Sequence, residues 1–116
     1  MIKLLLSIVL LAPILCRAQQ ETNYIDYHKR IIVAEQQFLY YNNPKAAVEQ
    51  YRKIFTDWKR PFARDCYTAL QIASLLKDTA DATFFFGQCF RNGVEWNTVV
   101  FSPPVNRLLQ EDMSYK

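Results

Sequence analysis

Apolar residues recur at intervals of three and four along four consecutive segments of the chain, which is the spacing of one face of an α-helix. The stripes consist of Tyr24, Tyr27, Ile31, Ala34, Phe38 and Tyr41; Ala47, Val48, Tyr51, Ile54 and Phe55; Cys66, Ala69, Leu70, Ala73 and Leu76; and Ala82, Phe85, Phe86, Cys89 and Phe90. Glycine occurs only twice in 116 residues, whereas all-β folds use it in turns and phosphate-binding folds use it in loops. The sequence therefore predicts a single all-α domain.

Turn and capping residues divide these stripes into helices that pair as hairpins. Asn43 is the expected N-cap of the second helix, because Pro44 follows it at the first helical position. The other boundary residues are Pro61 at the start of the third helix, Asp78 or Thr79 as the cap of the fourth, and Gly93 at its end. The pattern predicts antiparallel hairpins at about residues 24–58 and 61–92.

Residues 94–110 form two shorter apolar stripes, which predict two short helices. The stripes are Trp96, Val99 and Val100, and then Val105, Leu108 and Leu109, with Ser102 and Pro103 as the boundary between them. Stacked helical units need an atypical terminal cap. We therefore expect this segment to cover the open apolar side of the second hairpin, and the alternative is that Trp96 is exposed and docks on a partner.

The first 18 residues have the pattern of a secretory signal peptide. A basic start precedes the apolar run of residues 4–15, and Cys16 and Ala18 occupy the small-residue positions before a cleavage site. A membrane-spanning helix needs about 20 apolar residues, so this run is short for one. We expect cleavage before Gln19 and export to the periplasm or the cell exterior. The alternative is a lipoprotein anchored at Cys16, although Leu15 departs from that pattern.

The remaining chain, residues 19–116, is nearly neutral. It carries 12 Lys and Arg against 11 Asp and Glu. Nucleic-acid binding needs a concentrated basic face, so no nucleic-acid partner is expected. Contact with a membrane is expected only through lipidation of Cys16 or through a partner.

Residues 27–93 resemble degenerate tetratricopeptide repeats. The segments 46–55 and 82–90, which lie about 35 residues apart, are similar to the second helices of two successive repeats. In that family a small residue lets paired helices approach, and an aromatic residue one turn later fits between repeats. Ala47 with Tyr51, and Ala82 with Phe86, match these roles, whereas the first helices depart from the pattern. The layout is similar to uncharacterised exported bacterial proteins of this type.

The resemblance implies a peptide-binding groove along the leading helix of each hairpin. The corresponding residues are Lys29, Ile32, Gln36 and Tyr40 on the first helix, and Arg64, Tyr67 and Gln71 on the third. Both helices present a basic residue, an apolar or aromatic residue and a glutamine in the same order. This order suits an extended peptide with an acidic or amide group, and the alternative is an ordinary solvent-facing surface.

Cys66 and Cys89 remain after signal cleavage, and both lie on predicted core stripes. A disulfide between them is compatible with an oxidising compartment. Packed helix axes lie about 8–10 Å apart, however, and a disulfide needs Cα atoms within about 7 Å. Buried free thiols are therefore the favoured alternative.

No set of residues indicates catalysis. His28 is the only histidine, no second ligand accompanies it at metal-binding spacing, and no nucleophile or phosphate-loop motif occurs. We therefore expect no enzymatic activity, no metal and no cofactor. The sequence favours an exported interaction module for a protein or peptide partner. The alternative is a small structural or oligomer-forming envelope domain without a separate ligand.

Overall fold

The computed structural model describes residues 23–111, and all regular secondary structure in that part of the chain is helical. The elements are a leading helix (residues 23–39), α2 (Pro44–Asp57), α3 (Ala63–Leu75), α4 (Thr79–Arg91), α5 (Trp96–Phe101) and α6 (Pro103–Glu111). The predicted all-α fold is confirmed. The signal peptide predicted at residues 1–18, with Cys16, lies outside the described residues. None of the helices within 23–111 is long and apolar enough to cross a membrane.

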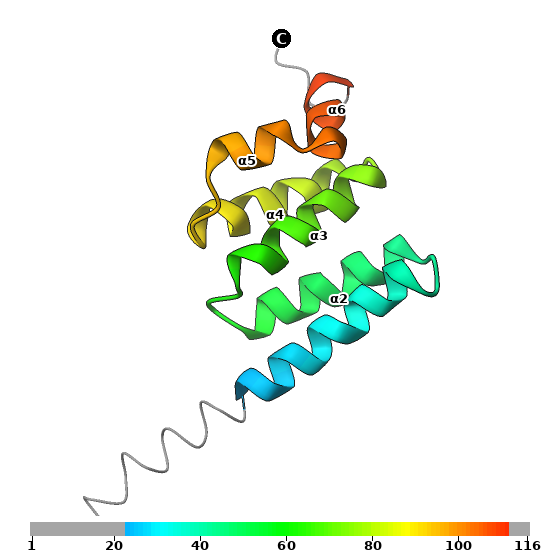
Figure 1. The fold of residues 1–116 in the computed structure, drawn as a ribbon, viewed down its shortest axis with the longest axis vertical. Coiled ribbons are helices and arrows are strands. Elements are labelled where there is room, and N and C mark those ends of the chain that lie inside the picture. The colour runs from blue at the N-terminus through cyan, green and yellow to red at the C-terminus, as the bar shows by residue number, and fades with distance from the viewer. Residues whose placement is uncertain (1–22, 112–116) are drawn as a thin grey trace, which may run out of the picture.

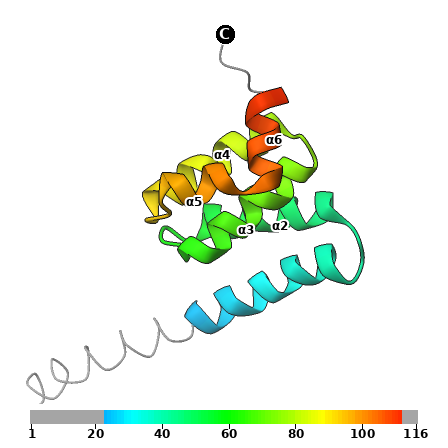
Figure 2. The same cartoon turned by 45° about the horizontal axis from the view of Figure 1, so that its top comes forward.

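The helices stack in chain order, and successive long helices run in opposite directions (Figure 1). The leading helix is followed by α2, and α3 by α4, while α5 and α6 lie over the α3–α4 pair (Figure 2). Because α3 packs against α2, α4 and α6, it is the central helix of the stack.

The predicted caps determine where α2 and α4 begin. The side chain of Asn43 accepts a hydrogen bond from the backbone N–H of Ala46 at 3.1 Å, and Pro44 is the first helical residue. Asp78 accepts in the same way from the N–H of Asp81 at 3.1 Å. These bonds satisfy N–H groups that have no partner within the helix, and both predicted caps are confirmed.

The predicted start of α3 at Pro61 is wrong by two residues. The helix begins at Ala63, and Phe62 before it has an extended backbone. The N–H of Phe62 donates a hydrogen bond to the hydroxyl of Tyr27 at 3.1 Å. This tertiary contact satisfies an N–H group at the helix start that has no partner within the helix, and no local sequence signal reports it.

The core contains most residues of the stripes predicted for the two hairpins, and four of these stripe residues are exposed. All five stripe residues of α2 are buried, as are the alanines Ala34, Ala47, Ala69 and Ala82. The residues predicted to be buried that are exposed instead are Tyr24, Tyr41, Leu76 and Phe90. Each of these four lies near or just beyond the end of a helix and is only partly covered by its neighbours.

The two hairpins are joined by contacts between α2 and α4 as well as through α3. Phe55 packs edge-on against Phe85, with ring centroids 5.8 Å apart. The guanidinium of Arg52 lies 4.6 Å from the ring centroid of Phe84 and pairs with the carboxylate of Asp81. These contacts combine apolar burial with cation–π and ion-pair attraction.

The C-terminal helices cover part of the α3–α4 pair. Val99, Val105 and Leu108 are buried, and α6 packs against α3. Trp96 is half exposed, and it stacks on Phe90 with ring centroids 5.5 Å apart. The segment therefore acts as a cap through its aliphatic residues, while the indole of Trp96 remains accessible.

Two buried tyrosines, Tyr27 and Tyr51, differ in how their hydroxyl groups are bonded. The Tyr27 hydroxyl donates to Asp65 Oδ2 at 2.6 Å. The Tyr51 hydroxyl has no hydrogen-bond partner among the described residues. A buried polar group without a partner loses its hydration without compensation.

We expect the same substitution to have opposite effects at these two positions. Tyr51→Phe should raise the free energy of unfolding by about 1 kcal/mol, because it removes an unpaired buried hydroxyl. Tyr27→Phe should lower it by about 2 kcal/mol, because the buried Asp65 loses a donor to a charged group. Urea denaturation followed by circular dichroism measures both changes.

Tyr40→Phe is the matched control, because Tyr40 is 80% exposed. Its unfolding free energy should equal that of the unsubstituted protein. If Tyr51→Phe destabilises the protein as much as Tyr27→Phe does, the Tyr51 hydroxyl has a partner and this part of the description is wrong.

Candidate functional site

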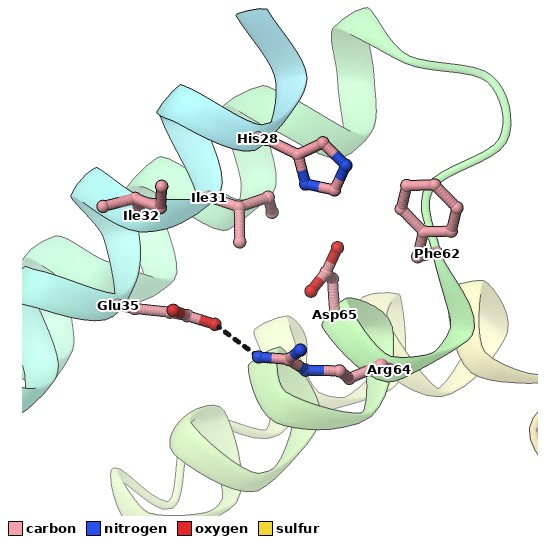
Figure 3. Close-up of a pocket in the computed structure, with 7 residues that line it drawn as sticks. All are labelled: His28, Ile31, Ile32, Glu35, Phe62, Arg64 and Asp65. Carbon is pink, nitrogen blue, oxygen red and sulfur yellow. Dashed lines mark hydrogen bonds and ion pairs between the residues drawn. The ribbon is translucent and has the colours of Figure 1, made fainter. Parts of the chain in front are cut away.

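A groove of about 410 Å³ lies between the leading helix and the start of α3 (Figure 3). It is lined by His28, Ile31, Ile32, Glu35, Phe62, Arg64 and Asp65. Ile31 and Asp65 are buried and form its floor, while His28, Ile32, Phe62 and Arg64 are exposed and form its rim. Its volume is within the range of about 300–1,000 Å³ that is typical of ligand pockets.

The carboxylate of Asp65 is held at the floor of the groove by a chain of two hydrogen bonds. The N–H of Phe62 donates to the Tyr27 hydroxyl, which in turn donates to Asp65 Oδ2. Burial, and then the bond to Asp65, raise the pKa of Tyr27 above its ordinary value. Tyr27 therefore stays a neutral donor, and it fixes the orientation of the carboxylate, which faces the space between His28 and Arg64 (Figure 3).

An ion pair spans the mouth of the groove. Arg64 Nη2 lies 3.4 Å from Glu35 Oε1, and the Arg64 side chain is 82% exposed (Figure 3). An exposed pair at this distance contributes only about 0–1 kcal/mol to stability. The guanidinium can therefore move aside at little cost.

Aromatic rings build one wall. The imidazole of His28 stacks on Phe62 with centroids 5.5 Å apart and an angle of 15° between the ring planes. Tyr24 and Tyr27 also contact Phe62, at centroid distances of 5.9 and 5.5 Å. Phe62 is held by these three neighbours but remains 44% exposed, so a face or edge of its ring is available to a ligand.

Two of the seven predicted groove residues, Ile32 and Arg64, line this groove. The other five are Lys29, Gln36 and Tyr40, which are exposed elsewhere on the leading helix, and Tyr67 and Gln71, which are partly buried on α3. Gln71 Nε2 donates a hydrogen bond to Ser102 Oγ at 3.1 Å. The amide of Gln71 is therefore already hydrogen-bonded to the residue before α6. Gln71 corresponds to Gln36 in the sequence pattern, but the two side chains have different surroundings.

Five residues that line the groove were not predicted as site residues: His28, Ile31, Glu35, Phe62 and Asp65. Ile31 was predicted to belong to the apolar core, and His28 was examined only as a metal ligand. Asp65 directly precedes the buried stripe residue Cys66, and it is an acidic residue in the first turn of α3. An acidic residue is common in the first turn of a helix because the helix dipole stabilises it. The position of Asp65 in the sequence therefore did not indicate a binding site.

Cys66 and Cys89 are both buried free thiols. Burial raises the pKa of each thiol to about 12, and the nearby Asp65 adds to the effect at Cys66. At neutral pH both are therefore protonated and poorly nucleophilic. Within residues 23–111 no group of three or more His, Cys, Asp or Glu could hold a metal ion.

Comparison of the chain with protein-family models, with curated proteins and with solved structures found no match.

The raised pKa values of the two thiols predict a loss of stability that begins near pH 9, and the raised pKa values of the buried Tyr27 and Tyr51 add to it above pH 10. In the unfolded chain the thiols ionise near pH 9 and in the folded protein near pH 12. The unfolded state therefore binds fewer protons above pH 9, and the free energy of unfolding should fall as the pH rises from about 9 to 12. Denaturation at pH 7, 9 and 10.5 measures this decline.

Alkylation provides an independent test of the same burial. Peptides that contain Cys66 or Cys89 should remain unmodified by iodoacetamide at pH 8 in the folded protein and react fully in denaturant, as mass spectrometry can show. Rapid modification of either cysteine in the folded protein would contradict the burial described above.

Proposed function

We propose that this protein is an exported, non-enzymatic interaction module, built from degenerate tetratricopeptide-like hairpins, that binds an extended segment of a partner protein or peptide. The binding site in this proposal is the groove between the leading helix and α3. The observation that carries the proposal is a hollow of about 410 Å³ with an exposed apolar and aromatic rim between these two helices.

The helix packing supports the tetratricopeptide-like part of the proposal. Ala34 and Ala69 correspond at an offset of 35 residues, as do Ala47 and Ala82, and all four are fully buried. Small residues at these positions let neighbouring helices approach closely. Tyr51 is buried in the core, and the partly buried Phe86 packs against that core. This arrangement is consistent with aromatic residues between successive hairpins.

The rim of the groove supports binding of a chain segment. Ile32 and Phe62 are 51% and 44% exposed, so a ligand that covers them removes apolar surface from water, which is favourable. Because the Arg64–Glu35 pair is exposed, a ligand can replace it without losing a buried interaction.

A selection from a displayed random-peptide library, with the full chain immobilised, tests this function. We expect synthetic versions of the enriched peptides to bind the unsubstituted protein, and Ile32→Asp to weaken binding at least tenfold because it places a charge on the apolar rim. Fluorescence anisotropy measures the affinity.

Leu39→Asp is the matched control, since Leu39 lies on the same helix, is 68% exposed and does not line the groove. It should change the affinity less than twofold. If no peptide binds in a way that depends on Ile32, peptide binding in this groove is refuted.

A second candidate, self-association, is favoured by an apolar stripe on the outward face of the leading helix. Ile25, Ile32 and Leu39 are exposed at seven-residue spacing, with Val33 and Tyr40 beside them. Residues seven apart lie on the same helix face, and this face is opposite to the buried residues Tyr27 and Ala34. A second copy of the chain would cover the stripe.

Light scattering tests this second candidate. Self-association predicts a mass of two or more chains at about 100 μM protein and a return to one chain with Leu39→Asp. A mass of one chain for the unsubstituted protein would exclude a structural role that depends on oligomers, and would leave the peptide-binding proposal in place.

A further inference from the structure

We propose that the groove recognises a cationic side chain, lysine or arginine, of the partner segment, with Asp65 and Glu35 as its polar contacts. This inference rests on the peptide-binding function proposed above and specifies its ligand. It differs from the sequence-based expectation, which assigned an acidic or amide group to the ligand.

The first reason is the buried charge of Asp65. The residue is only 5% exposed, yet no Lys or Arg among residues 23–111 forms an ion pair with it. The neutral hydroxyl of Tyr27 is its side-chain donor. A buried carboxylate is costly without a cation or further donors, so a ligand cation in the groove would gain a strong charge-assisted hydrogen bond.

The second reason is the charge balance of the groove. Its lining contains two carboxylates, Glu35 and Asp65, and one guanidinium. Arg64 reaches Glu35 at 3.4 Å rather than Asp65, and its side chain extends into solvent. Apart from His28, the lining therefore carries more carboxylates than cations. A cationic group is attracted, and an acidic group that approaches Arg64 is repelled by Asp65.

The third reason is the shape and chemistry of the walls. Lysine and arginine have long aliphatic stems that pack along apolar surface while their charged ends remain at polar groups. Ile31 and Ile32 offer such a surface, and the exposed part of the Phe62 ring lies across the groove from them (Figure 3). A cation near the face of this ring gains a cation–π attraction in addition to the carboxylates.

The probes for the test are synthetic peptides obtained from the library selection, with their termini blocked. Each enriched peptide is compared with versions in which arginine is replaced by citrulline, or lysine by norleucine, which remove the charge and keep a similar length. We expect the neutral versions to bind the full-length protein at least tenfold more weakly by fluorescence anisotropy.

Variants of the protein identify the groups that recognise the charge. Asp65→Asn retains an oxygen that accepts from Tyr27, and Glu35→Gln retains the shape of a partly exposed side chain. Each should reduce the ratio of affinities between charged and neutral peptides at least threefold. Glu49→Gln on α2, which does not line the groove, is the control and should leave the ratio unchanged.

Arg64→Gln distinguishes recognition of a cation from recognition of an acid. It removes the one guanidinium of the groove, so binding of the cationic peptide should strengthen at least twofold. Thermal melts establish that each variant is folded. If Asp65→Asn does not fold, the two single variants Glu35→Gln and Arg64→Gln suffice for the test.

Three results would overturn the inference: enriched peptides that carry acidic residues in place of Lys or Arg, neutral versions that bind within twofold of the charged ones, or Arg64→Gln weakening the binding. If these results occur with peptides whose binding depends on Ile32, the cation inference fails and the peptide-binding function stands. If no peptide depends on Ile32, both fail.

Discussion

The buried hydrogen bond between Tyr27 and Asp65 connects the leading helix to α3. It joins residues 38 positions apart in the chain, at 2.6 Å, and the N–H of Phe62 extends it by a further bond to the Tyr27 hydroxyl. The two bonds link the leading helix to the first turn of α3 and to the residue before it. A hydrogen bond to a charged group in a buried setting is among the stronger single contacts in a small domain.

The same contact gives the groove its polarity. Asp65 accepts the hydrogen bond of Tyr27, and its carboxylate lies at the floor of the groove between the leading helix and α3. The apolar contacts of Ile31 and Phe62 bring the two helices together on either side. In the proposed function, stability and ligand selection both depend on this one carboxylate, and substitutions that preserve its hydrogen bond but not its charge separate the two roles.

Much of the fold was predictable because it depends on local chemistry. The N-cap at Asn43 and the stripe of α2 follow from residues that are adjacent or one helical turn apart. What the sequence did not show depends on distant contacts: the N–H of Phe62 before α3 donates a hydrogen bond to Tyr27, and the amide of Gln71 donates one to Ser102. For the site, Ile32 and Arg64 were expected from the groove that the tetratricopeptide resemblance implies, but the position of Asp65 beside them arises only when α3 packs against the leading helix.

Detection of the Tyr27 hydroxyl proton by NMR tests the central contact most directly. A hydroxyl that donates to a buried carboxylate exchanges slowly with water, so we expect a resolved resonance with nuclear Overhauser effects to the backbone amide of Phe62 and to protons of Asp65. A Tyr27 hydroxyl that exchanges too fast to observe, together with no contacts between Tyr27 and residues 62–65, would show that the two hairpins are not joined as described here.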